Sequence, residues 1–253
     1  MPSAIAAPPP ALCWICRKHP AGSGEHRFKA SDLRARAPGL AQDQPLFLQR
    51  GRATNDRIIS AKSRALKYPD SMCLRCNDTL SAPYDRDWQT LSEFLAANWD
   101  SVFKRGAFEL VSVFPGRTES AALNVHLFFV KLFGCKIHEG GVPIDLAPSS
   151  QALLGPGHHP EISLTVCADH RDPNLVAALD TPVDTWQHPR EGVHYARWSY
   201  ALPPFAVQVH YIKAGTPLRP PGHLWRAGHV GTLVNLSAYL DSGVPPSFDP
   251  ANP

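Results

Sequence analysis

Two short stretches, 13-CWIC-16 and 73-CLRCN-77, decide how the amino-terminal part of this chain is expected to fold. Each places two cysteines three positions apart, a spacing at which both thiolates of a tight turn bind one metal ion. Zinc takes four such ligands in a tetrahedral structural site. We therefore expect one zinc ion to be shared by Cys13, Cys16, Cys73 and Cys76. The alternative is that these cysteines are buried or redox-active thiols.

The remaining cysteines, Cys135 and Cys167, stand alone, so the six cysteines do not form a disulfide framework. Paired spacing in a chain of 253 residues is typical of metal binding in a reducing compartment. The first residues lack the basic and apolar segments of a signal peptide. The most apolar run, 121-AALNVHLFFVKLF-133, is too short to cross a bilayer. We therefore expect a cytoplasmic protein that does not span a membrane.

Charge is distributed unevenly along the chain. Residues 1–106 carry 16 Lys and Arg against 10 Asp and Glu, a net +6, whereas residues 107–253 carry 9 against 12, a net −3. A polyanion such as nucleic acid is attracted to a positive segment of this kind. The simpler alternative is a solvated basic face. The 26 prolines favour many loops over a long helical bundle.

Composition and hydrophobic spacing predict two domains, residues 12–106 and 107–245, between a flexible lead-in of residues 1–11 and a tail of residues 246–253. Apolar side chains recur at helical spacing in 85–103, which predicts a helix with Asp85 as its N-cap. The later segments predict a buried helix in 121–133 that ends at Gly134, strands in 161–168, 193–202 and 205–212, and a last strand or helix within 230–240.

An acid–histidine pair, Glu25-His26, lies between the two cysteine pairs, and Asn77 directly follows Cys76. The order C-x-x-C, Glu-His, C-x-x-C-Asn resembles the HNH endonucleases that carry zinc in a ββα-metal fold. The resemblance covers residues 12–104. It implies an α+β chain in which a zinc-stapled, treble-clef-like ββα unit is followed by a mixed α/β domain.

The resemblance also implies the chemistry of a site that hydrolyses phosphodiester bonds in DNA. His26 would be the general base, because an imidazole with a pKa near neutrality can take a proton from water. Glu25 and the side-chain oxygen of Asn77 would hold a divalent cation, Mg²⁺ or Mn²⁺, which prefers oxygen ligands and offsets charge on the phosphate. The structural zinc would fasten these distant segments together.

The chain departs from the family pattern at three points. Asn77 stands where many members have histidine, although an asparagine oxygen can still bind a cation. The family's middle asparagine, which orients the general base, is not at its usual place, and Asn55 is the nearest candidate. The frequent Gly-Gly after the first motif is replaced by 31-SDLRARAPGL-40.

Basic side chains near these motifs are candidates for phosphate contacts, namely Arg27, Lys29, Lys62 and Arg64. Asp85 is a candidate cation ligand if it is not a helix cap. Ten of the twelve histidines lie in residues 107–253, including His158-His159 and the segment 167-CADH-170. No second cysteine pair or Glu-x-x-His helix accompanies them, so we assign no metal site there.

Two alternatives to a nuclease stay open at this point. The first is a non-catalytic zinc-finger protein that binds nucleic acid or a protein partner. The second is a zinc-stabilised interaction module unrelated to nucleic acid. The second predicted domain could recognise a target, bind a partner protein or cover the nuclease, and the sequence does not choose among these roles.

Overall fold

The computed structural model describes residues 11–50, 55–169, 177–219, 222–228, 232–238 and 247–248. Nearly all of the predicted lead-in, most of the predicted tail and His170 lie outside the described residues. The helices are α1 (Ala30–Arg36), α2 (Ala82–Arg105), α3 (Leu110–Val113), α4 (Thr118–Gly140) and α5 (Ala147–Leu154), with a 3₁₀ turn η1 (Arg64–Leu66) and a π-helical segment η2 (Arg75–Leu80). The strands are β1 (Leu46–Gln49), β2 (Asn55–Ile58), β3 (Ala107–Glu109), β4 (Ile162–Ala168), β5 (Ala177–Asp180), β6 (Asp184–His188), β7 (Gly192–Leu202), β8 (Phe205–Ile212), β9 (Leu218–Arg219), β10 (Leu233–Ser237) and β11 (Ser247–Phe248).

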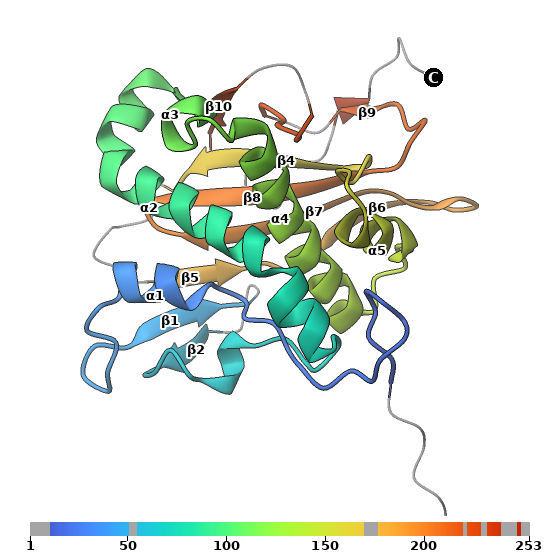
Figure 1. Ribbon diagram of the computed structural model, residues 1–253, viewed down its shortest axis with the longest axis horizontal. Coiled ribbons are helices and arrows are strands. Elements are labelled where there is room, and N and C mark those ends of the chain that lie inside the picture. Colours follow the sequence, from blue (N-terminus) through green and yellow to red (C-terminus); the bar gives the residue numbers. More distant parts are fainter. Residues whose placement is uncertain are drawn as a thin grey trace, which may run out of the picture.

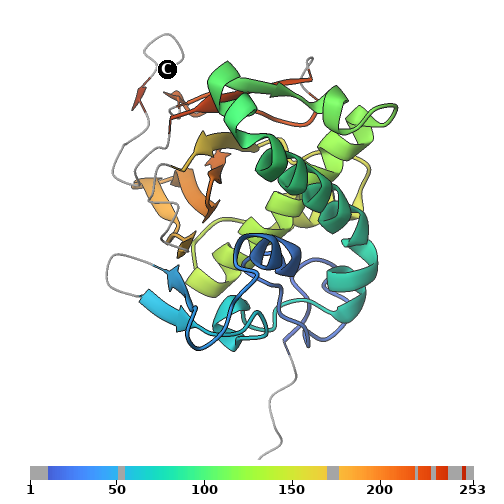
Figure 2. The same ribbon diagram turned by 90° about the vertical axis from the view of Figure 1, so that its left-hand side faces the viewer.

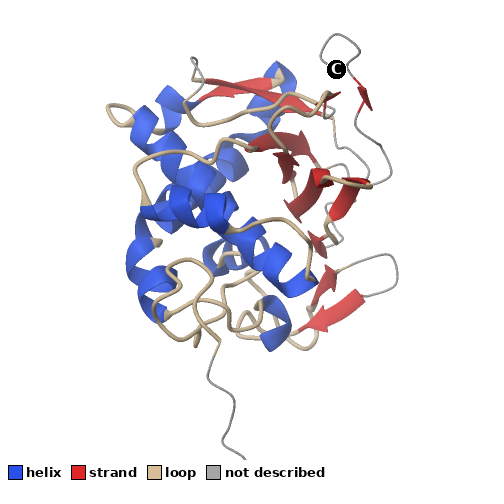
Figure 3. Cartoon of the chain, turned by 90° about the vertical axis from the view of Figure 1, so that its right-hand side faces the viewer, coloured by secondary structure: helices blue, strands red, loops and turns tan. Residues whose placement is uncertain are grey.

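Within the described residues, nine strands form one mixed sheet in the order β2-β1-β5-β7-β8-β4-β10-β3, with β6 paired to β7. β1 runs parallel to β5, and β10 runs parallel to β4, whereas the other pairs are antiparallel. Most of the helical turns lie on one side of the strands (Figures 1 and 3). The chain is thus a mixed α/β fold, which agrees with the predicted class in its coarse form.

The division predicted between residues 106 and 107 does not separate two cores. Strand β1 from the amino-terminal part pairs with β5, α2 packs along α4, and one cluster of buried apolar side chains includes residues from both parts. In Figure 2 the hairpin of β1 and β2 lies at the lower end of the molecule, below the strands of the carboxy-terminal half. A two-stranded hairpin cannot bury its own apolar face, so Leu46, Leu48 and Ile58 are buried against the rest of the fold.

Helix α2 confirms the predicted helix and extends it at the amino-terminal end. It begins at Ala82 with Pro83 in its first turn, and it ends before Gly106, whose left-handed φ of 67° suits a helix stop. Its predicted apolar stripe is buried at Trp88, Leu91, Leu95 and Val102. Asp85 is not the N-cap, because the helix begins three residues earlier.

Helix α4 is longer than predicted and does not end at Gly134. It continues to Gly140 and stops before Gly141, which has a left-handed φ of 59°. Gly134 is required for a different reason: a Cβ at this position would lie 2.3 Å from the nearest ring carbon of Trp14. The first cysteine turn, which contains Trp14, therefore packs directly against the middle of the carboxy-terminal half.

Helix α4 is long and apolar enough to cross a membrane, whereas the apolar run 121–133 that stood out in the sequence is too short. However, 83% of its most apolar window is buried inside the fold, as in the core helix of a soluble protein. Lys131, which interrupts this apolar helix, is fully buried. A buried lysine needs a compensating partner, and Lys131 has two, Glu25 and Asp85.

The strands predicted in the second half are present. β7 and β8 pair directly, and Leu202 faces Phe205 across the two-residue turn at Pro203 and Pro204. β10 is a strand rather than a helix. The sequence of β4 alternates apolar and polar residues, which is typical of a half-buried strand, but all seven of its residues are buried, so both of its faces are covered.

Candidate functional site

The four paired cysteines come together, as the sequence predicts. Their sulfur atoms all lie within 4.8 Å of one another, and those of Cys16 and Cys73 are 3.8 Å apart. Four sulfurs bound at about 2.3 Å around a tetrahedral zinc ion would be about 3.8 Å apart, so the spacing suits that ion. Cys13, Cys73 and Cys76 are buried, and Cys16 is half-buried. The group is therefore a four-thiolate site that can bind a metal such as zinc.

The surroundings of the cysteines favour a bound cation. Burial disfavours the Cys16 thiolate, but hydrogen bonds from the backbone of Lys18 and His19 outweigh it and lower the pKa of Cys16 to about 6. Burial raises the pKa of Cys13 and also that of Cys76. A metal ion would supply the positive charge that stabilises further thiolates in this group.

The acid–histidine pair lies on a segment that pairs antiparallel with the chain leading into Cys73. The backbone N–H of Tyr68 donates to the carbonyl of Glu25 at 2.8 Å, and isolated bridges join Ser23 to Met72 and His26 to Lys67. The side-chain amide of Asn77 donates to Ser23 Oγ at 2.7 Å. The cysteine turns and this pairing together bring segments about fifty residues apart into one site.

A cleft of about 350 Å³ opens beside this pairing. Glu25, His26 and Asn77 all line it. Three basic side chains, Lys29, Arg34 and Lys67, also line the cleft, and of these only Lys29 was singled out from the sequence. The cleft thus combines an imidazole, oxygen ligands and positive charge.

Lys131 contacts two of the acidic residues of the cleft from the core of the fold. Its ammonium Nζ lies 2.5 Å from Glu25 Oε2 and 3.1 Å from Asp85 Oδ1, and it donates to Ser81 Oγ at 3.1 Å. Burial alone would lower the pKa of Lys131, but Glu25 and Asp85 outweigh it and raise that pKa. The ammonium therefore stays charged and holds both carboxylates in place.

Glu25 is fixed by two contacts on different oxygens. Oε2 pairs with Lys131, and Oε1 accepts a hydrogen bond from the backbone N–H of His26 at 2.7 Å. Asp85 is held less tightly, because about a quarter of its side chain is exposed, and burial raises its pKa. The two carboxylates and one ammonium together carry one net negative charge.

The His26 imidazole is suited to accept a proton. Burial is the main influence on it and lowers its pKa, assisted by the positive charges of Lys67 and Lys131, while Glu25 opposes the shift. The pKa therefore lies below the ordinary value near 6.5, and the ring is neutral at pH 7. A neutral ring in a cleft that opens to solvent can act as a general base.

The oxygen atoms of the cleft differ in what they already contact. Asn77 Oδ1 is a buried oxygen that accepts no hydrogen bond from the described part of the chain. The negative charge of Glu25, however, is already balanced by Lys131. Asp85, which also lines the cleft, offers a further carboxylate oxygen. The resemblance implied Glu25 and Asn77 as the cation ligands, and in the structure Glu25 is paired with Lys131.

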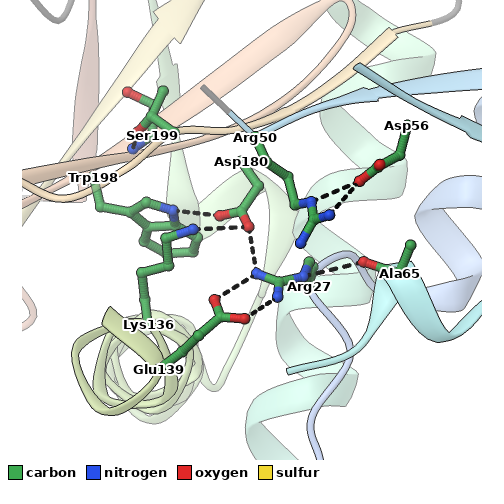
Figure 4. Close-up of polar contacts among 10 residues, drawn as sticks. Arg27, Arg50, Asp56, Ala65, Lys136, Glu139, Asp180, Trp198 and Ser199 are labelled. Carbon is green, nitrogen blue, oxygen red and sulfur yellow. Dashed lines mark hydrogen bonds and ion pairs between the residues drawn. The ribbon is translucent and has the colours of Figure 1, made fainter. Parts of the chain in front are cut away.

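The prediction that Arg27 contacts phosphate is wrong, because its side chain is buried. Its guanidinium forms a fork with the two carboxylate oxygens of Glu139, donates to Asp180 Oδ2 at 2.7 Å and donates to the Ala65 carbonyl at 3.1 Å. Asp180 also accepts from Lys136 at 2.9 Å and from the Trp198 indole at 2.7 Å (Figure 4). This network connects Arg27, the residue after His26, to α4 through Glu139 and to the sheet through Asp180.

Asp180→Asn is expected to destabilise the fold by about 3–5 kcal/mol, because Lys136 and Arg27 would lose their shared buried carboxylate. The matched control is Asp56→Asn, which removes the partially exposed ion pair with Arg50 (Figure 4) and should cost less than about 1 kcal/mol. Urea denaturation of both variants at pH 7 measures the two losses. Equal losses would show that the buried network does not stabilise the fold.

The other predicted residues lie away from the cleft. Lys62 and Arg64 are exposed but do not line it, so they remain candidates for contacts with a longer ligand. Asn55 is exposed at the start of β2, and the described residues that line the cleft include no asparagine besides Asn77. Asn55 therefore does not lie in the cleft that His26 lines.

Sequence reasoning missed Lys131, Arg34 and Lys67. A signal for Lys131 was present, because a lone lysine inside the most apolar segment of the chain requires a buried acidic partner. Arg34 and Lys67 carried no such signal, since exposed basic residues are common along the whole amino-terminal part. Comparisons of this chain with protein-family models, with curated proteins and with solved structures found no match.

Proposed function

We propose that this protein is a metal-dependent endonuclease of the HNH type that hydrolyses phosphodiester bonds in DNA. The observation that carries the proposal is the cleft in which a neutral His26 lies beside Glu25 and Asn77, next to a four-cysteine group. The antiparallel pairing before Cys73 and the helical segment after it support a ββα arrangement around that group. Zinc would hold this arrangement together.

In the proposed reaction, His26 accepts a proton from the attacking water. Glu25 binds the backbone N–H of His26, and Lys131 fixes Glu25, so the imidazole is held by a chain of contacts that begins in the core. Lys29, Arg34 and Lys67 would bind phosphates on both sides of the bond that is cleaved. A divalent cation, held by Asn77 and the acidic residues, would offset negative charge on the phosphate.

The proposal is tested with supercoiled plasmid DNA and Mg²⁺ or Mn²⁺. Nicked or linear product should form, and leaving out the added Mg²⁺ or Mn²⁺ should stop its formation. Because general-base catalysis requires a neutral imidazole, the rate should fall as the pH drops through the pKa of His26. The midpoint of this loss should lie below 6.5, since burial lowers that pKa. A rate that increases on acidification would contradict the assignment.

Lys131→Met should strengthen cation binding, because it removes a unit positive charge from the carboxylate pair. At an effective dielectric constant of about 20, one charge pair at roughly 4 Å is worth about 4 kcal/mol. Tenfold tighter Mn²⁺ binding needs only part of this energy, so we expect at least that increase in affinity. Mn²⁺ titration without DNA measures the affinity. Lys136→Met is the control, because it removes a second buried lysine of α4 that pairs with Asp180 outside the cleft. Unchanged or weaker Mn²⁺ binding by a folded Lys131→Met protein would contradict the proposed cation site.

The second candidate function is a non-catalytic zinc-finger protein that binds nucleic acid or a protein partner. Two observations favour it over the nuclease: Glu25 is already neutralised by Lys131, and Asn55 does not lie in the cleft. Under this alternative, the basic side chains of the cleft would bind phosphates without cleavage. Binding of DNA without hydrolysis, across cations and strand types, would support it.

A further inference from the structure

Two histidines and a glutamate gather at the tip of the hairpin formed by β6 and β7 (Figure 1). His188 pairs with Gly192 across the hairpin, and His194 lies where the register of β7 shifts, between Val193, the partner of Gln187, and Tyr195, the partner of Trp186. The two imidazole rings are 5.2 Å apart and nearly parallel, at 20°. Glu191 lies in the turn between the strands. This cluster lies outside the cleft and is not used in the proposed reaction.

The potential ligand atoms of these three residues already converge. One nitrogen from each histidine and one carboxylate oxygen of Glu191 all lie within 4.8 Å of one another. The closest pair is His194 Nε2 and Glu191 Oε2, at 2.9 Å. Two imidazoles and one carboxylate, with a fourth position open to solvent, form a ligand set that zinc uses in proteins. A metal ion therefore needs only a small local adjustment to bind.

The ring orientations are also held by neighbouring groups. His194 Nδ1 lies 3.0 Å from the hydroxyl of Thr216, and His188 Nδ1 accepts a long hydrogen bond from the backbone N–H of Arg190, at 3.4 Å. A metal-bound His194 would donate its Nδ1–H to the Thr216 hydroxyl, as metal-bound histidines do to an outer partner. A metal-bound His188 would give up the bond from Arg190, because an Nδ1 that accepts a hydrogen bond leaves the ring proton on Nε2. Lys213 donates to the Glu191 carbonyl at 2.9 Å, which fixes the turn.

We propose that His188, Glu191 and His194 form a second metal site, for Zn²⁺ or a similar ion that prefers nitrogen ligands, at the exposed tip of this hairpin. The imidazole ligands select such an ion over Mg²⁺, which prefers oxygen. The site is accessible from solvent, and its open position accepts water or one further ligand atom. The proposal is independent of nuclease activity, because it uses none of the residues of the cleft.

The test counts bound metal in the full-length protein. Purified protein is equilibrated with a slight excess of Zn²⁺ over chains, and bound zinc is measured after dialysis against buffer of known free zinc concentration. The parent should hold one equivalent more than His194→Ala and more than Glu191→Gln, each checked for folding by circular dichroism. His138→Ala removes an exposed histidine on α4 and should bind as much zinc as the parent.

The test compares the zinc content of the parent with that of each variant, so the result does not depend on how many metal ions the cysteine group holds. Co²⁺ gives a second readout, because ions bound by thiolates show sulfur charge-transfer absorption and ions bound by histidine and glutamate do not. The equivalent lost in His194→Ala should lack that absorption. Equal zinc content in the parent and both variants would overturn the proposal, as would a lost equivalent that shows thiolate absorption.

Discussion

Cys73→Ser is expected to abolish zinc binding and to unfold the amino-terminal part of the chain. The parent should carry about one tightly bound zinc ion per chain as purified, and the variant should carry none. A serine hydroxyl is a far poorer zinc ligand than a thiolate, and structural zinc contributes apparent free energies of about 10–16 kcal/mol to the folding of zinc-finger peptides. Metal analysis and thermal unfolding measure the two effects.

The loss of folded structure should extend beyond the cysteines, because the turns that carry them pack against the rest of the protein. Trp14 fills the space that Gly134 leaves on α4, and the Ser150 hydroxyl of α5 donates to the Ile15 carbonyl. Loss of the metal should therefore also loosen the segment that carries Glu25 and His26. Unfolding should be measurable by the loss of near-ultraviolet circular dichroism from the buried tryptophans.

Cys135→Ser is the matched control for this experiment. Cys135 is as deeply buried as Cys73, but it lies beside Met72 and is not part of the four-cysteine group. It should keep the full zinc content of the parent and lose only a modest amount of stability. A folded parent without zinc, or a Cys73→Ser protein that retains it, would show that these cysteines do not form a structural metal site.

His26→Ala is expected to reduce DNA cleavage by about 10²–10⁴-fold, which is the usual contribution of a general base. The variant should keep its fold and its zinc, because the imidazole is only half-buried and ligates no metal in the four-cysteine group. DNA binding should also survive, since Lys29, Arg34 and Lys67 are unchanged. Plasmid cleavage and a binding assay at the same salt concentration separate these effects.

His138→Ala provides a control with the same chemical change on the exposed end of α4, and it should cleave at the parental rate. Cleavage by His26→Ala at the parental rate would show that His26 is not the base. If the parent binds DNA but does not cleave it under any condition, the zinc-finger alternative becomes the better interpretation. Separate fragments of the two halves are unsuitable for these assays, because they share one sheet and one core.

Short-range patterns determined the parts of the site that depend on local spacing. The paired cysteines predicted the four-cysteine group, because C-x-x-C spacing lets both thiols of a pair bind one metal ion and zinc takes four such ligands. The resemblance to the HNH endonucleases implied that Glu25, His26 and Asn77 converge, and all three line one cleft. Periodicity likewise found α2 and the pair β7 and β8, because it reports which positions of one segment are buried.

The tertiary structure alone decided which segments meet. Arg27 looked like a phosphate-binding residue, but it is paired with Glu139 and Asp180, more than a hundred residues away. Lys131 belongs to the half of the chain that had no assigned role, yet it supplies the positive charge beneath Glu25. Hydrophobic periodicity carries no information about these pairings, since burying a charge becomes favourable only when a distant, opposite charge is brought into contact with it.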